Sequence, residues 1–295
     1  MSNLRCSLSL QCVVFFVCTL NGQAQEAPPP LVPESSGVNK CRFVSFEVPT
    51  ENATFGPTAI RINFTTLQVV VPPYTGGPTV SWSRFFGRAA FAGPPSEYRE
   101  SGTSSMTFQA SIAQCTPHYQ DWSTVGLLHV TGTHIVPSST YHVEQVAATC
   151  KGREGDFHCL PGGGEVSNQL EIKTSRWGDL ATPFNPPSPS VQPDASDIGA
   201  LVTKFRNDPG APPKVQAILA GVPGNSWGEV TANRLSEDFG FSHISACVDA
   251  FRGASYPYRM GKCNGAPTPP ATGVCLTNSD CTGANGAGSC ELYCP

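Results

Sequence analysis

A serine between two glycines, in the stretch Gly224-Asn225-Ser226-Trp227-Gly228, is the residue pattern that points most directly to chemistry. A serine in this spacing is a nucleophile when it stands on a sharp turn between a buried strand and a helix, and Asp238 and His243 follow it in the order that a triad requires. Here Gly221-Val222-Pro223 precedes the serine, where the buried strand would have to end. We therefore predict a turn in a surface loop and a protein that is not an enzyme, with an unrecognised hydrolase as the least favoured alternative.

Three aromatic residues, Trp82, Phe85 and Trp122, suggest a second kind of chemistry, because flat aromatic faces on an exposed sheet can stack on sugar rings. The same side chains are also what the core of a β domain needs, and that role is the commoner one. A polysaccharide-binding site at these three residues is therefore the second hypothesis for the function.

Cysteines are frequent, and their meaning depends on where the chain resides. Residues 1–24 have the features of a signal peptide, with an apolar segment from Leu8 to Leu20 and small residues at the cleavage positions in Gly22-Gln23-Ala24. Ten cysteines remain after its removal, and an even number in an exported chain indicates disulfides rather than metal thiolates. They are Cys41, Cys115, Cys150, Cys159, Cys247, Cys263, Cys275, Cys281, Cys290 and Cys294. We predict five disulfides and no free thiol. The sequence does not determine which cysteines pair, and the best-supported single pairing is the local one of Cys150 with Cys159 across a glycine-rich loop.

The charge of the chain limits its partners. Only 14% of the residues are charged, the formal net charge is −4, and Lys and Arg form no block that would follow a phosphate backbone. The apolar segment of the leader is short for a membrane span, and we expect no transmembrane segment once the leader is removed. We therefore predict a secreted or cell-surface protein whose partner is an extracellular protein or a polysaccharide, and not a nucleic acid.

Apolar residues at alternating positions predict the elements that would position these groups. The clearest strands lie at 41–48, 59–64, 105–113, 125–130, 141–149 and 169–174, and turn-forming residues fill 72–78. About seven short strands between turn residues favour an antiparallel β-sandwich over residues 41–175. The segment from Trp82 to Tyr98 shows no strand pattern that we could assign.

Two stretches of this β region resemble fibronectin type III and related immunoglobulin-like domains. Ile135 to Val143 resembles the corner before the F strand, where a proline lies four residues before a tyrosine whose hydroxyl bonds back to the chain; here these residues are Pro137 and Tyr141. Val166 to Thr174 resembles the closing G strand. The resemblance implies a β-sandwich of this general kind and no particular function.

A repeated helix pattern occupies the C-terminal half of the chain. Residues 197–206 and 243–252 carry Ile, Ala, Val, Phe and Arg at the same offsets, with apolar residues at i, i+3, i+4 and i+7. Neither helix is long enough to persist alone, so we expect the two apolar stripes to face each other, with the phenylalanines supplying a large part of the contact. The stripes are Ile198, Leu201, Val202 and Phe205 in the first copy and Ile244, Cys247, Val248 and Phe251 in the second.

The repeat also resembles a dockerin, in which two calcium loops each lead into a helix that begins with Asp-Ile or Asp-Val. By this resemblance Asp179, Asp194 and Asp197 would be ligands in one degenerate calcium loop, and Ca²⁺ is the only cofactor that the sequence suggests. In the second copy His243 replaces the closing aspartate, and imidazole is a poor ligand for this ion. The alternative, which we favour, is that Asp194 or Asp197 caps the N-terminus of a helix.

Together these patterns predict a mainly β protein with a small α module: an antiparallel β-sandwich, a dockerin-like helix pair and a disulfide-rich tail. The boundaries are a signal peptide at 1–24, a proline-rich linker at 25–40, the sandwich at 41–175, the helical repeat at 176–260 and a cysteine-rich tail at 261–295. The leading functional hypothesis is a non-catalytic exported binding or surface-display protein whose helical repeat docks a protein partner.

Overall fold

The computed structural model gives a mainly β protein with a small α-helical part, which confirms the coarse fold class predicted from the sequence. It describes residues 27–34, 40–51, 55–71, 75–81, 89–99, 107–132, 134–152, 159–160, 163–181, 193–220, 239–254, 256, 261–264 and 289–292. The strands of the main sheet are β1 (Val32–Pro33), β2 (Phe43–Glu47), β3 (Thr58–Val71), β4 (Thr75–Ser81), β5 (Ala90–Ala92), β6 (Ser96–Arg99), β7 (Thr107–Gln114), β8 (Leu127–Thr131), β9 (Ser139–Ala147) and β10 (Leu170–Lys173). A 3₁₀ turn, η1 (Ala148–Cys150), follows β9.

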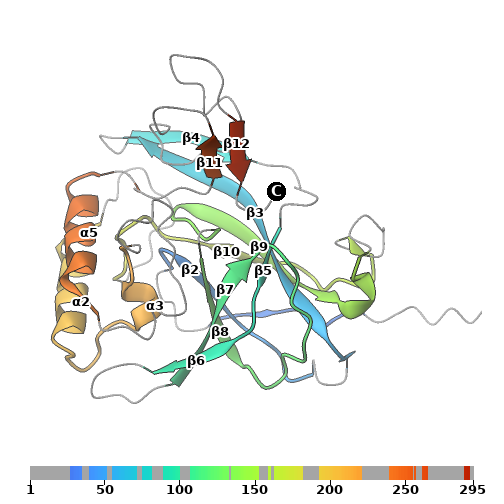
Figure 1. Cartoon of the computed structure of the whole chain (residues 1–295). Coiled ribbons are helices and arrows are strands. Elements are labelled where there is room, and N and C mark those ends of the chain that lie inside the picture. Colours follow the sequence, from blue (N-terminus) through green and yellow to red (C-terminus); the bar gives the residue numbers. More distant parts are fainter. Residues whose placement is uncertain are drawn as a thin grey trace, which may run out of the picture.

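These strands form one continuous sheet whose two ends meet. The order along the sheet is β1-β2-β8-β7-β5-β3-β9-β10, with β4 added beside β3 and β6 beside β7. β7 and β8 run parallel, whereas every other pair within this sheet is antiparallel. β1 and β10, at the two ends of the order, are in contact, so the sheet is mixed and nearly closed like a barrel (Figure 1). The predicted antiparallel sandwich of the fibronectin type III or immunoglobulin kind is therefore wrong.

The length of β3 is one physical reason for this difference. The strand has 14 residues and shifts its register between Phe64 and Thr66. It pairs with β9 over its first ten residues, with β5 at Arg61 and Ile62, and with β4 from Thr66 onward. The sequence pattern ended this strand at Phe64 because the alternation of apolar residues ends there. One strand thus joins parts of the sheet that two shorter strands would have separated into two layers.

The interior of the sheet is filled by the inward-pointing apolar residues, as alternation predicts for a half-buried strand. Ile60 and Ile62 of β3 are buried in it with Val143 of β9. Trp122 lies fully buried in the same core, and its indole N–H donates a hydrogen bond of 2.7 Å to the carbonyl of Thr58. A tryptophan in this position holds the start of β3 from the inside.

The hydroxyl of Tyr141 forms the bond back to the chain that the sequence resemblance implied. It accepts the N–H of Val136 at 2.7 Å and donates to the carbonyl of His134 at 3.0 Å. Burial raises the pKa of this tyrosine far above its usual range. The bond fixes the corner before β9, but a local corner does not determine how the strands are ordered in the sheet.

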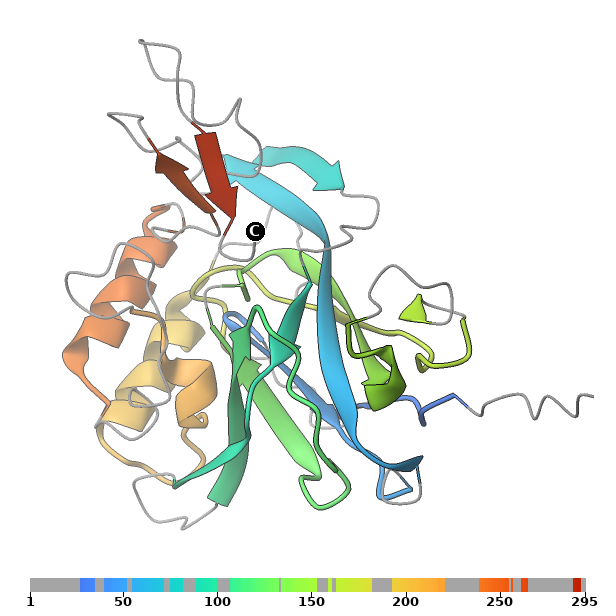
Figure 2. The same ribbon diagram turned by 45° about the vertical axis from the view of Figure 1, so that its right-hand side comes forward.

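The helices lie together on one side of the sheet (Figures 1 and 2). They are α2 (Ala195–Phe205), α3 (Lys214–Ala217) and α5 (Phe241–Phe251), and α2 and α5 contact each other. Val215 and Ile218, in and after α3, are buried against Phe43, Tyr98 and Ala110 of the sheet. Within the ranges given above, none of the helices combines the length and the apolar character needed to cross a membrane.

A separate pair of strands is formed by the C-terminal part of the chain. β11 (Gly261–Asn264) and β12 (Ser289–Leu292) are antiparallel, and their register places Cys263 opposite Cys290. This pairing brings together two cysteines of the predicted disulfide-rich tail.

The turn that leads from the sheet to the helices requires a glycine at residue 178. Its φ is +88°, and a Cβ atom at this position would lie 2.7 Å from Cβ of Ala250 in α5.

We therefore expect Gly178→Ala to lower the free energy of unfolding by about 2–4 kcal/mol, measured by urea denaturation. The matched control is Gly199→Ala in α2, where the added methyl group meets nothing within 4 Å. That change should stabilise the protein by about 0.5–1 kcal/mol. Equal effects of the two variants would contradict the close approach of the turn to α5.

Candidate functional site

Each repeated helix begins with a buried polar side chain that holds the preceding chain. In α2, Asp194 is the N-cap and accepts the N–H of Ser196 at 2.7 Å, while Asp197 completes a capping box by accepting the N–H of Asp194 at 2.8 Å. The other carboxylate oxygen of Asp197 accepts the N–H groups of Leu180 at 2.6 Å and of Ala181 at 2.7 Å. The capping role expected for these aspartates is confirmed, and Asp197 also binds the turn before the helix.

These surroundings bear on the three predicted calcium ligands. The hydroxyl and the N–H of Ser196 lower the pKa of the exposed Asp194 carboxyl, and Asp197 is buried with both oxygens bonded to backbone N–H groups. Asp179 is buried near the start of this segment. In the described part of the chain these aspartates do not form a group whose possible ligand atoms converge. A Ca²⁺ ion held by them would have to compete with the cap of α2.

His243 stands in α5 where Asp197 stands in α2, and it has a comparable structural role. The imidazole is buried, its Nδ1 accepts the N–H of Ala220 at 3.1 Å, and its ring stacks on Phe239 with the centroids 5.0 Å apart. The other two residues of the serine motif, Ser226 and Asp238, lie outside the described residues. The histidine thus binds a backbone group that precedes its own helix.

The buried polar residues determine which side of each helix faces inward. The inward residues are Asp197, Leu201 and Lys204 in α2 and, at the equivalent positions of α5, His243, Cys247 and Ala250, with Ile244 beside them. The predicted stripes began one residue later, at Ile198 and Ile244. They are therefore wrong for Val202, Phe205 and Phe251, which are exposed.

Four large apolar side chains are consequently turned toward solvent on the helix pair. Val202 and Phe205 of α2 are 38% and 50% exposed, and Phe241 and Phe251 of α5 are 68% and 37% exposed. Among the other residues whose side-chain exposure is described, only Val32 is a large apolar residue of similar exposure. We call these four the exposed helix residues, and they are the part of the surface best suited to binding an apolar partner.

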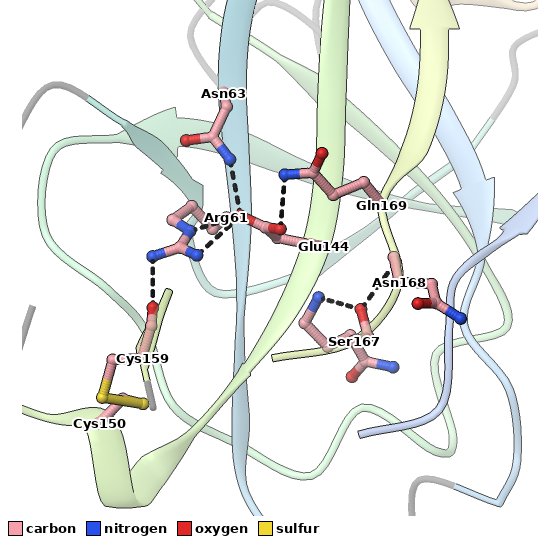
Figure 3. Close-up of polar contacts among 9 residues, drawn as sticks. Arg61, Asn63, Glu144, Cys150, Cys159, Ser167, Asn168 and Gln169 are labelled. Atoms are coloured by element: carbon pink, nitrogen blue, oxygen red, sulfur yellow. Dashed lines mark hydrogen bonds and ion pairs between the residues drawn. A yellow bond between two sulfur atoms is a disulfide. The ribbon is translucent and has the colours of Figure 1, made fainter. Parts of the chain in front are cut away.

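A second candidate, which the sequence did not reveal, is a polar network around Glu144 of β9 (Figure 3). The carboxylate is fully buried, and its Oε1 lies 2.7 Å from Nε and from Nη2 of Arg61 and 2.7 Å from the amide nitrogen of Asn63. Its Oε2 accepts a hydrogen bond of 2.9 Å from Gln169. Arg61 also donates to the carbonyl of Cys159 at 3.3 Å. Because this carboxylate is paired and hydrogen-bonded on both oxygens, it joins strands and a loop rather than acting as a free base.

The cysteines form two groups in the structure. Cys150 and Cys159 make the predicted disulfide, with their Cα atoms 5.4 Å apart, and Cys115 is also disulfide-bonded. A carboxylate oxygen of Glu165 lies 3.1 Å and 3.5 Å from the two sulfurs of the first bridge. These three residues could converge on a metal ion, but the disulfide uses both thiolates.

Cys41 and Cys247 differ from the prediction of five disulfides, because both are buried thiols in the structure. Three other predicted members of the disulfide framework, Cys275, Cys281 and Cys294, lie outside the described residues.

Of the three aromatic residues predicted to bind a polysaccharide, only Trp122 lies in the described part of the chain. Trp122 is fully buried in the core, so it offers no face to a sugar ring. Trp82 and Phe85 lie outside the described residues. The correction for Trp122 follows from its indole N–H, which bonds inward to the backbone of β3.

His129 of β8 is a buried titratable group that the sequence patterns did not single out as a site residue. Its Nδ1 lies 3.1 Å from the hydroxyl oxygen of Tyr98, and its ring packs edge-on against Phe43 and stacks on Phe108. Burial lowers its pKa to about 4, so the ring is neutral at neutral pH. The histidine is buried against Phe43 and Tyr98, two residues of the sheet that belong to the same cluster as Val215 and Ile218.

Replacing Asp197 by Asn is expected to lower the free energy of unfolding by about 2–4 kcal/mol, because the amide must turn a donor toward a backbone N–H. Asp249→Asn, at an exposed position of α5, is the matched control and should change it by less than about 0.5 kcal/mol. Urea unfolding of both variants measures the difference. Indistinguishable curves would show that the carboxylate does not hold the turn at residues 180 and 181.

The exposed phenylalanines should contribute little to the folded state. We expect Phe205→Ala and Phe251→Ala each to change the free energy of unfolding by no more than about 1 kcal/mol. Leu201→Ala removes a fully buried side chain on α2, the helix that carries Phe205. This change should lower the free energy of unfolding by about 2–5 kcal/mol. Limited proteolysis and urea denaturation test all three variants. A loss as large as that of Leu201→Ala in either phenylalanine variant would restore the facing stripes predicted from the sequence.

Known proteins offer no direct guide to this arrangement. No protein-family model, no curated protein and no solved structure matches the chain. Together with the inward rotation of both helices and the capping role of Asp197, this result overturns the dockerin-like interpretation of the repeat. The helices are a pair with related sequences, and their function has to be argued from their own surface.

Proposed function

We propose that this protein is an exported, non-catalytic binding or surface-display protein whose helix pair docks a protein partner. The observation that carries the proposal is the exposure of Val202, Phe205, Phe241 and Phe251 on α2 and α5. Aromatic side chains are enriched among the residues that supply most of the binding energy in protein interfaces. A partner with an apolar surface would bury these side chains, and the removal of their apolar area from water would stabilise the complex.

The buried side of the same helices supports a binding role. Leu201 and Cys247 are fully buried, and Asp197 and His243 bind backbone groups, so the outer residues are presented on supported helices. Rigid presentation lowers the entropy lost when an interface forms. The helices can therefore offer apolar residues to a partner without depending on those residues for folding.

Export is supported by the leader pattern of residues 1–24 together with the disulfide chemistry. Disulfides such as Cys150–Cys159 persist in oxidising compartments and are rare in reducing ones. The partner is accordingly expected to be an extracellular or surface-attached protein.

Site-specific photo-crosslinking tests the proposal. A benzophenone amino acid at Phe205 or Phe241 of the exported chain, on its native cells, should give one predominant adduct with a second protein. The matched control places the same amino acid at Val32, which is 44% exposed on β1 and belongs to the sheet. With the captured protein purified, the double variant Phe205→Ala, Phe241→Ala should bind it roughly 30-fold or more weakly, and Val32→Ala should bind normally.

Three outcomes would overturn the proposal. These are adducts of the same composition from Val32 as from the helices, an adduct that contains only a second copy of this chain, and unchanged affinity of the double variant. The stability of each variant is measured in parallel, so that a loss of binding is not confused with a loss of folding.

A further inference from the structure

Two buried thiols lie at one point of the junction between the sheet and the helices. Cys41 precedes β2 and Cys247 lies on α5, and both are fully buried members of the same apolar cluster. The cluster also contains Leu201 and Ile244 from the helix pair. Residues that are far apart in the sequence therefore place their thiols in one buried cluster.

Gly178 links the two sulfurs directly. Its N–H donates to Sγ of Cys41 at 3.3 Å, and its carbonyl oxygen accepts from Sγ of Cys247 at 3.5 Å. The two sulfurs thus contact the amide nitrogen and the carbonyl oxygen of a single residue. Gly178 has no side chain to separate them, and the close approach of Ala250 keeps that space closed to any larger residue.

We propose that Cys41 and Cys247 are a disulfide-forming pair that covalently joins the first long strand of the sheet to helix α5. Each sulfur gives up its hydrogen, one S–S bond forms in the protein, and an external disulfide is the oxidant. The S–S bond of that oxidant breaks, and it leaves as two thiols, so that hydrogens and electrons balance.

The burial of the Cys41 and Cys247 thiols determines at which stage of folding their S–S bond can form. It raises the pKa of the Cys41 thiol far above its usual range and that of Cys247 to about 12, where the carboxylates of Asp197, Asp179 and Asp194 add to the effect. The thiolate is the reacting species in disulfide exchange, so the closed fold protects both the thiols and the finished bond. The bond therefore forms while the helices are still assembling on the sheet.

The pair would also complete the expected framework. The chain expected after removal of the leader has an even number of cysteines, and among the residues whose side chains are described Cys41 and Cys247 are the two thiols. A bond between them closes a long loop of chain, and long loops give the largest effect on the unfolded state.

Peptide mapping without reduction tests the pairing in the full chain, secreted into an oxidising medium and treated with N-ethylmaleimide in denaturant. The expected result is a linked pair of peptides that contains Cys41 and Cys247 and separates on reduction. Maleimide on both residues, or a link from either one to another cysteine, would overturn the proposal.

Variants supply an independent measurement. Cys41→Ala should leave Cys247 open to maleimide in denaturant, and Cys247→Ala should do the same for Cys41. Each single variant and the double variant should lower the melting temperature by the same amount, roughly 5–15 °C, because any of them removes the same bond. Cys150→Ala with Cys159→Ala is the control and should leave the peptide pair unchanged. Single losses that sum to the loss of the double variant, with no labelling of the remaining cysteine, would contradict a shared bond.

Discussion

The carboxylate of Asp197 is the constraint on which the arrangement of the helical part depends. It accepts three backbone N–H groups, from Leu180, Ala181 and Asp194, so it must face the chain that enters the helix. An unpaired buried carboxylate or N–H group would be costly, and this requirement outweighs the burial of one more apolar side chain. The rotation of α2 follows from it, and His243 imposes the same rotation on α5. The apolar residues that remain outside, such as Phe205, are the consequence.

The sheet and the helices are joined through polar groups as well as apolar ones. Arg42 is fully buried beside β2, donates from Nη1 to the carbonyl of Leu219 at 2.9 Å, and places its guanidinium 5.6 Å from the ring centre of Tyr256. Ser175 donates its N–H to the carbonyl of Lys40 at 2.7 Å. A junction built from directional bonds of this kind has one preferred geometry, which apolar contact alone would not specify.

The sequence predicted those features that depend on neighbours along the chain. The helices at 195–205 and 241–251 follow from a local period, and the Cys150–Cys159 bridge closes a short loop. The parallel pairing of β7 with β8 and the contact of β1 with β10 depend on partners far away, so alternation could not order the strands. The Glu144 network was missed for the same reason, because only the register of β3 on β9 places Arg61 opposite it. For the candidate site, the sequence predicted the two helices but not which of their residues face inward. That orientation depends on hydrogen bonds of Asp197, which hydrophobic periodicity does not take into account.

The contact between β1 and β10 also has a temporal consequence. β1 can contact β10 only when the chain has been synthesised as far as Lys173, where β10 ends. Pairings between distant segments form late and slowly, because the entropy of closing the intervening chain is lost before any contact is gained. A nascent chain that has emerged only as far as β9 therefore still has an open sheet with two unpaired edges. The sheet of such a chain cannot close until β10 is present to contact β1.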